Sequence, residues 1–280
     1  MTNLIITKPL VRRYAAKLVE EEKSPYTREK YLRDLRRFAA YAGSRPVTKA
    51  MTLGYKAELE RRYPARSVNS LLAALNSFLR FAGRDDLRVR HLRTQKDAFR
   101  PESAELTRDE YIRLIDAADA LNDELASLIL QTICSTGIRV SELKYVTVEA
   151  VKLGETDVAC KGKTRRIFIV SALRDKLLRF AKKNGTKSGP VFCTKGGKPL
   201  DRSNVWRKMK SLCGKAGIPE QKVFPHNLRH LFARTFYENE HDLAALADIL
   251  GHSSINTTRI YIISTGAEHA KRMENMDLVL

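Results

Sequence analysis

The sequence is poor in the features that mark secreted, zinc-binding and membrane proteins. Its four cysteines are scattered, form no CxxC pair and indicate reduced thiols, not a disulfide framework or a zinc site: Cys134, Cys160, Cys193 and Cys213. No apolar run approaches the roughly 18 residues of a membrane helix. The first residues also lack the basic segment and apolar stretch of a signal peptide. We therefore expect a cytoplasmic protein with no membrane segment.

Carboxylates at metal-binding spacing are missing too, so we expect no metal ion and no cofactor. Acidic residues are few overall, since 32 Asp and Glu stand against 51 Lys and Arg and leave a net charge of +19. Residues 1–100 hold 23 basic and 10 acidic residues, whereas residues 101–280 hold 28 and 22. Solvating the surface of a small domain takes a net charge of only roughly 2–8. The excess therefore predicts a polyanionic partner, contacted most by the first hundred residues.

A length of 280 residues with 43% hydrophobic content predicts two packed domains. The first, residues 1–88, shows apolar residues at helical spacing in short segments with basic faces. One helix is expected to begin at Thr27, as its N-cap, and to end at Gly43. Further helices are expected at 8–22, 50–62 and 67–83. Their aromatic residues, such as Phe38 and Phe78, are assigned to the core.

A basic segment, residues 89–104, loses this periodicity and is expected to link the domains. The second domain, residues 105–280, begins with a capping box formed by Thr107 and Glu110. Its pattern predicts helices at 123–136, 139–143, 171–183, 201–216, 226–238, 242–250 and 254–261, and strands at 146–148, 156–160 and 166–170. The predicted fold class is therefore mainly α with a small β-sheet.

Six polar residues of the second domain have no obvious structural role. They follow helix breaks, flank a glycine in the predicted hairpin turn or share a helix face: Arg139, Lys161, His226, Arg229, His252 and Tyr261. Such a set suits phosphodiester chemistry, because arginines offer permanently charged forks to the non-bridging oxygens of a reacting phosphate. A tyrosine hydroxyl is a competent nucleophile if a neighbour accepts its proton, and a lysine can protonate the departing alkoxide.

Three segments that carry these residues resemble the signature boxes of the tyrosine site-specific recombinases, the phage-integrase and Xer family. They are STGIRVSEL at 135–143, HNLRH at 226–230 and LGHSSINTTRIY at 250–261. Short patterns recur by chance, but here all three occur in the family's order. The resemblance covers residues 106–265, and the basic helices before them resemble the family's SAM-like core-binding domain.

The resemblance implies a site-specific recombinase or integrase that cleaves and rejoins DNA without ATP or metal. Tyr261 would form a covalent 3′-phosphotyrosine, and strands would be exchanged through a Holliday junction. Arg139 and Arg229 would hold the scissile phosphate, to which His252 would donate a hydrogen bond. His226 would assist proton transfer with the nucleophile.

Two lysines compete for the role of general acid towards the leaving 5′ oxygen. The family's hairpin often reads GKGxKxR, whereas this chain reads CKGKTRR at 160–166. Alignment on Lys-Gly favours Lys161, but Lys163 can take the same place, and both alternatives stay open. Glu142 resembles the family's supporting acidic residue. His230 is expected to be a buried, hydrogen-bonded histidine that packs the active-site helix.

The resemblance also implies an assembly on DNA. The two domains would close as a C-shaped clamp around duplex DNA, and four copies would act on two recombination sites. The free chain is expected to be a monomer or weak oligomer located at the nucleoid, and residues 266–280 would dock on a neighbouring subunit. Exposed basic residues are predicted to contact DNA: Arg33, Arg36, Arg37, Arg66, Arg80, Arg93, Lys96, Arg202, Arg207 and Lys208.

Two other functions remain alternatives. A type IB topoisomerase has related chemistry but relaxes DNA as a monomer, and the second and third boxes favour a recombinase. A DNA-binding regulator without activity predicts a broken set of active-site residues, whereas all six are present. The single tryptophan, Trp206, is assigned to packing. An extra arm-binding domain, as in many larger integrases, is not evident, which favours a simple Xer-like or mobile-element recombinase.

Overall fold

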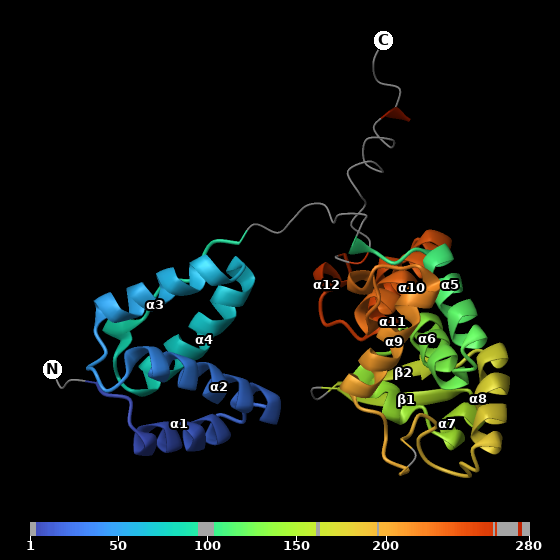
Figure 1. Cartoon of the computed structure of the whole chain (residues 1–280), viewed down its shortest axis with the longest axis horizontal. Coiled ribbons are helices and arrows are strands. Elements are labelled where there is room, and N and C mark those ends of the chain that lie inside the picture. Colours follow the sequence, from blue (N-terminus) through green and yellow to red (C-terminus); the bar gives the residue numbers. More distant parts are fainter. Residues whose placement is uncertain are drawn as a thin grey trace. The chain divides into compact units, whose positions relative to one another are not determined.

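The chain forms two compact units, residues 1–96 and 97–280 (Figure 1). The computed structural model describes residues 4–94, 104–160, 163–194, 196–259, 261 and 274–275. The domain limits expected from the sequence, 1–88, 89–104 and 105–280, stay predictions. Within the described parts of the chain, no helix is long and apolar enough to cross a membrane.

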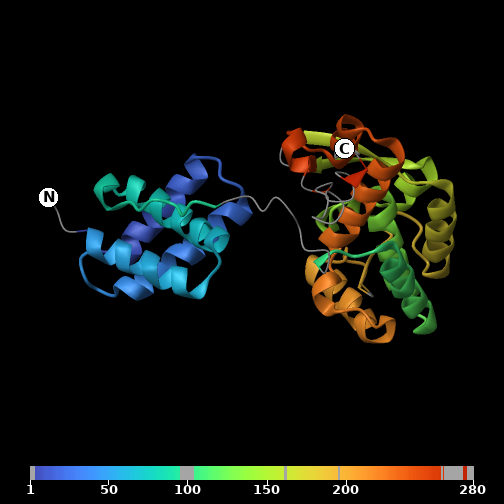
Figure 2. The same ribbon diagram turned by 90° about the horizontal axis from the view of Figure 1, so that it is seen from above.

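The first unit is helical, as predicted. It contains α1 (Lys8–Glu20), α2 (Pro25–Ala42), α3 (Lys49–Arg62), α4 (Ala65–Phe81) and the short 3-10 helix η1 (Asp85–Leu87). Helix α2 packs on α4, and Figure 2 shows these helices from above. Aromatic rings fill the core, with Tyr14 meeting Phe78 edge-on at 5.4 Å and Phe38 meeting Tyr55 at 5.0 Å.

The N-cap of α2 is Ser24, so the prediction of Thr27 was wrong. The Ser24 hydroxyl accepts the Thr27 backbone N–H, and Pro25 occupies the first turn. Proline is favoured there because its missing N–H has no helical partner to lose and its φ angle is already helical. Gly43 ends the helix at a φ of 62°, as predicted.

The second unit is mainly helical with one hairpin. Its described elements are α5 (Arg108–Ala120), α6 (Glu124–Thr136), η3 (Val140–Tyr145), α7 (Val148–Leu153), β1 (Glu155–Cys160), β2 (Lys163–Phe168), α8 (Ser171–Lys183), α9 (Arg202–Ala216), η4 (Glu220–Lys222), α10 (Pro225–Glu240), α11 (Leu243–Leu250) and α12 (Ile255–Arg259). Helix α6 is central, because α5, α8, α9 and α10 all pack against it. That position explains why α6 is buried on most of its circumference.

Two local predictions for this unit need correction. Residues 146–148 were expected to form a strand, but α7 begins at Val148, because Thr147 caps it by accepting the Ala150 backbone N–H. Residues 139–143 belong partly to a 3-10 helix, η3. The capping box of Thr107 and Glu110 and the antiparallel hairpin of β1 and β2 are both present, as predicted.

Replacing Gly137 with alanine is expected to lower the free energy of unfolding of the second unit by about 2–4 kcal/mol. Gly137 ends α6 at a φ of 62°, and an added Cβ would lie 2.6 Å from a Phe232 ring carbon. Urea unfolding measures the loss. Gly185→Ala is the matched control, since Gly185 has a similar φ of 70° with nothing within 4 Å of an added Cβ. Equal losses in the two variants would contradict the close packing at Gly137.

Candidate active site

Arg139 lies directly after the break at the end of α6, where the chain becomes extended. Its backbone N–H donates to Glu142 Oε2 at 2.8 Å, and its guanidinium Nη1 donates to Oε1 at 2.9 Å. The Glu142 carboxylate therefore binds both the backbone N–H and the guanidinium of Arg139. The guanidinium stays partly exposed to solvent. Burial alone would raise the pKa of Glu142, but the Arg139 N–H and the nearby guanidinium groups outweigh it and lower that pKa.

Arg229 lies on α10 and is only 2% exposed. Its guanidinium donates to the backbone carbonyls of Gly137 and Leu250, and Nη2 also lies 3.0 Å from His252 Nε2. Burial, reinforced by the charge of Arg139, lowers the pKa of Arg229 to about 10, so it stays cationic at neutral pH. This one side chain joins the ends of α6 and α11.

His252 follows Gly251, which ends α11 in the left-handed region. Burial and the neighbouring Arg229 charge lower the pKa of His252 to about 4, so the ring is neutral at pH 7. Because a guanidinium only donates, His252 Nε2 must accept from Arg229, which assigns the ring proton to Nδ1. Nδ1 then donates to Thr258 Oγ1 at 2.9 Å.

Tyr261 is buried among three histidine rings. Its ring centroid lies 4.2 Å from that of His230, 5.4 Å from that of His252 and 5.6 Å from that of His226. Tyr261 also lies close enough to Arg229 to raise the pKa of that guanidinium, against the larger effect of burial. His230 is buried, whereas His226, at the start of α10, is exposed. Segments distant in sequence thus converge on the ring of Tyr261.

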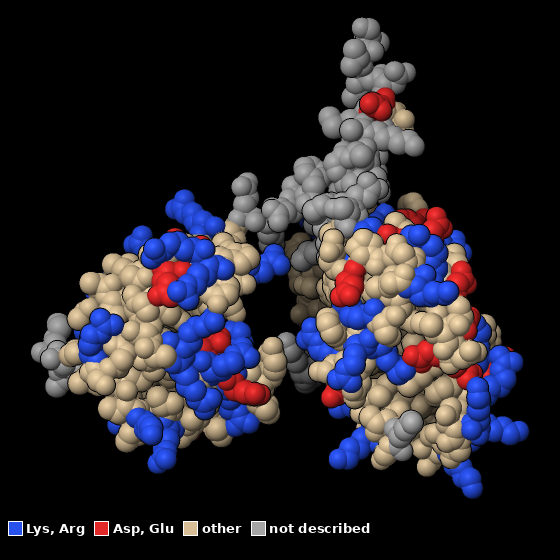
Figure 3. Space-filling model, in the orientation of Figure 1, with Lys and Arg blue, Asp and Glu red and all other residues tan. Residues whose placement is uncertain are grey.

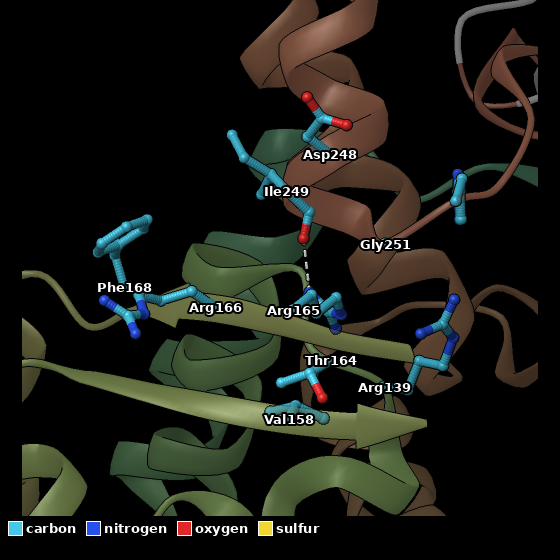
Figure 4. A pocket seen from close by; sticks show the side chains of 10 residues that line it. Arg139, Val158, Thr164, Arg165, Arg166, Phe168, Asp248, Ile249 and Gly251 are labelled. Atoms are coloured by element: carbon cyan, nitrogen blue, oxygen red, sulfur yellow. Dashed lines mark hydrogen bonds between the residues drawn. The ribbon is translucent and has the colours of Figure 1, made fainter. Parts of the chain in front are cut away.

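Two cavities open beside these groups, and Arg139 lines both. One, of 440 Å³, lies between the hairpin and the end of α11 and is lined by Arg165 and His252 among others (Figure 4). The other, of 510 Å³, lies between Arg139, His226 and α9. Trp206 lines this second cavity and is 48% exposed, so its assignment to packing was wrong. An exposed tryptophan in a cavity lined by Arg139, Arg202 and Arg229 is suited to contact a ligand surface.

The structure leaves the choice of lysine open. Lys161 lies outside the described residues, and of Lys163 only its place on β2, opposite Cys160, is described. Lys96 also lies outside them. The other predicted DNA-contacting arginines are exposed. Figure 3 shows Lys and Arg side chains over the visible face of each unit, interspersed with acidic ones. Lys208 is instead paired with Asp123 at 2.7 Å.

Sequence reasoning missed Arg165. It lies on β2 and donates to Glu142 Oε2 at 2.6 Å, so it shares the carboxylate that holds Arg139. The signal was available in the strand pattern, because Ile167 and Ile169 face the core and Arg165 lies in the same alternating register.

Comparisons with known proteins identify the family of the chain. Residues 104–268 match the phage integrase family, and residues 11–86 match the phage integrase N-terminal SAM-like domain. The chain belongs to the phage integrase family. The recombinase is 29% identical over 283 residues to tyrosine recombinase XerA of Pyrococcus horikoshii, with 98% of this chain and 96% of that protein covered.

Other relatives support the same conclusion. The recombinase is 30% identical over 267 residues to tyrosine recombinase XerD of Halalkalibacterium halodurans, with 87% and 88% covered. A crystal structure of a lambda integrase tetramer bound to a Holliday junction shares the fold, with a TM-score of 0.75, 18% identity, and 93% and 78% covered. The chain is thus a site-specific tyrosine recombinase that breaks and rejoins DNA, and the predicted fold class, with its SAM-like and catalytic domains, is confirmed.

The low pKa of His252 predicts a loss of stability in mild acid. The unfolded recombinase protonates this ring below its ordinary pKa of 6.5, whereas the folded form takes the proton only near pH 4. The contribution of neutral His252 to the free energy of unfolding is therefore fully present above pH 6.5. It is lost between pH 6.5 and 4, which lowers that free energy by about 1–2 kcal/mol after allowance for partial exposure. Urea unfolding at pH 7 and pH 5, followed by Trp206 emission, measures it. If His252→Gln showed the same loss as the wild type, the assignment to His252 would be wrong.

Proposed function

We propose that Tyr261 attacks the scissile phosphate of a DNA recombination site and forms a 3′-phosphotyrosine. The observation that carries this proposal is the burial of Tyr261 beside three histidine rings and near Arg229. These neighbours come from separate segments of the chain. A phenol needs a neighbouring base to become a nucleophile at neutral pH. His226 is proposed as that base, because it is exposed towards the cavity and its ring lies beside that of Tyr261.

The two arginines are proposed to bind the non-bridging oxygens of the phosphate. Arg229 is already fixed by two backbone carbonyls and His252, so little reorganisation is needed when charge develops. Arg139 donates from Nη1 to Glu142, and its side chain lines both cavities. The neutral His252 is proposed to take the tautomer with its proton on Nε2 when DNA binds and to donate that proton to the phosphate, while Nδ1 accepts from Thr258 Oγ1. His230 packs beside the Tyr261 ring.

A lysine of the hairpin, Lys161 or Lys163, is proposed to protonate the leaving 5′ oxygen. The phosphotyrosine bond keeps the energy of the cleaved phosphodiester, so attack by a 5′ hydroxyl reverses the step and rejoins a strand without ATP. Attack by the hydroxyl of a partner strand instead exchanges strands and gives a Holliday junction. Neither step calls for a cofactor in this scheme.

The recombinase is proposed to clamp duplex DNA between its two units and to act as a homotetramer on two sites. Both units carry exposed arginines suited to phosphates, so affinity should fall steeply with salt. The lambda integrase tetramer on a Holliday junction, which shares this fold, supports the assembly. The tail that was predicted to dock on a neighbouring subunit, residues 266–280, lies outside the described residues except 274–275 and stays a prediction.

Covalent capture from a random DNA pool tests this function. Duplexes nicked at one position are mixed with the purified chain, and adducts that survive detergent are recovered and sequenced. We expect adducts that converge on one sequence, with protein at the 3′ end of the cut strand. Adducts without sequence preference, together with relaxation of supercoiled DNA, would favour a type IB topoisomerase. Binding with no adduct would favour an inactive regulator.

A further inference from the structure

Strand β2 carries a charged residue on its inward face. Arg165 alternates with Thr164 and Arg166, which are exposed, and its side chain is only 8% exposed. A buried guanidinium is costly to desolvate, and acceptors placed against its donors offset that cost. The contacts of Arg165 therefore indicate the role of its buried charge.

Two acceptors from different segments bind this guanidinium. Nη2 donates to Glu142 Oε2 at 2.6 Å. Nη1 donates to the backbone carbonyl of Ile249, also at 2.6 Å (Figure 4). The aliphatic stem lies against Gly251, where an added Cβ would fall 2.4 Å from Arg165 Cδ. The hairpin, the segment after α6 and the end of α11 thus meet at one side chain.

Each acceptor leads directly to a residue proposed to bind the phosphate. Glu142 uses its other oxygen on the Arg139 guanidinium, so Arg165 fixes the carboxylate that aims Arg139. Ile249 lies three residues before His252, and Gly251 immediately precedes it. Arg165 therefore anchors the turn from which His252 reaches Arg229.

We propose that Arg165 is a positioning residue for cleavage. It sets Arg139 and His252 in register with β2, the strand on which Lys163 lies. Its Nη1 and Nη2 donate to Ile249 and Glu142. The inference rests on the proposed function, since it concerns the same phosphate site. A misplacement of about 1 Å in such a site costs on the order of 100-fold in rate.

The first test compares Arg165→Met and Arg165→Lys with Arg166→Met on the selected nicked substrate. Arg166 is the matched control, because it is the next residue on the strand but is 54% exposed and paired with Asp157. We expect single-turnover cleavage at saturating DNA to slow about 100-fold for Arg165→Met and about 10-fold for Arg165→Lys, whose point charge cannot serve both acceptors. DNA affinity should stay within about threefold for both, and Arg166→Met should cleave at the wild-type rate.

The second test separates positioning from general damage. A methylphosphonate linkage has one charged oxygen replaced by methyl, so it depends less on a well-aimed arginine. We expect the deficit of Arg165→Met to shrink on this substrate, in parallel with that of Arg139→Ala, to below about tenfold. An equal deficit on both linkages would indicate a merely structural role and overturn the proposal.

The outcomes are distinguishable from failure of the proposed function. If the wild type forms no covalent adduct, the function itself fails. If the wild type forms it and Arg165→Lys cleaves at the wild-type rate, only the role of Arg165 is overturned. Should Arg165→Met unfold below the assay temperature, Arg165→Lys on both linkages decides the matter by the same criteria.

Discussion

Replacing Tyr261 with phenylalanine is expected to abolish covalent capture of DNA, with a loss of more than about 1,000-fold in adduct formation. The change removes only the hydroxyl. The ring remains to pack against His230, His226 and His252, and the buried position keeps its apolar contacts. Folding and DNA binding should therefore persist while the nucleophile is lost.

Binding can be followed in the same samples by Trp206 emission, since this single tryptophan lines the cavity beside Arg139. Tyr237→Phe is the matched control, because Tyr237 lies in the same apolar cluster but stacks on His241, away from the histidines around Tyr261. It should form adducts as the wild type does. A Tyr261→Phe variant that still becomes covalently attached would show that another residue attacks the phosphate.

A 5′-bridging thiol in the substrate is expected to identify the general acid. Loss of the true general acid should slow cleavage of normal DNA by about 100–10,000-fold, because an alkoxide leaves poorly without a proton. A thiolate leaves without protonation, so the same variant should recover to within about tenfold of wild type on the thiol substrate. Single-turnover cleavage by Lys161→Ala and Lys163→Ala on both substrates measures this.

The two variants serve as controls for each other. Each removes one positive charge, at positions two residues apart, so an effect on DNA affinity alone would appear in both and would not be rescued by sulfur. The resemblance favours rescue of Lys161→Ala. Rescue of Lys163→Ala instead would assign the acid to β2, and rescue of neither would place the acid outside the hairpin.

Much of the site was predictable because its residues lie in short boxes. Gly137 before Arg139 and Gly251 before His252 indicate helix ends. The HNLRH segment is typical of a helical turn. The hairpin followed from β-branched runs on either side of a basic turn. These are local signals, and local sequence suffices to find them.

The misses depend on contacts between distant segments or on a choice between nearby residues. Trp206 has an apolar ring, which favours burial in a sequence-based prediction. Tertiary packing decides which face of α9 is covered, and the described residues leave this ring about half exposed. Arg165 lies 23 residues from Glu142 and 84 from Ile249, separations that no local pattern records. Thr27 and Ser24 are both good caps, and Pro25 decided between them.

The carbonyl contacts of Arg229 have a consequence for how this recombinase could lose its activity. A side chain that ties the ends of two helices together is part of the scaffold as well as of the chemistry. Any replacement there leaves two buried carbonyls without their donor, at a cost of about 1–3 kcal/mol each. A descendant that gave up strand cleavage but still had to fold and occupy DNA is therefore expected to change Tyr261 or Arg139 and to retain Arg229, so an intact arginine at position 229 is no evidence of an active enzyme.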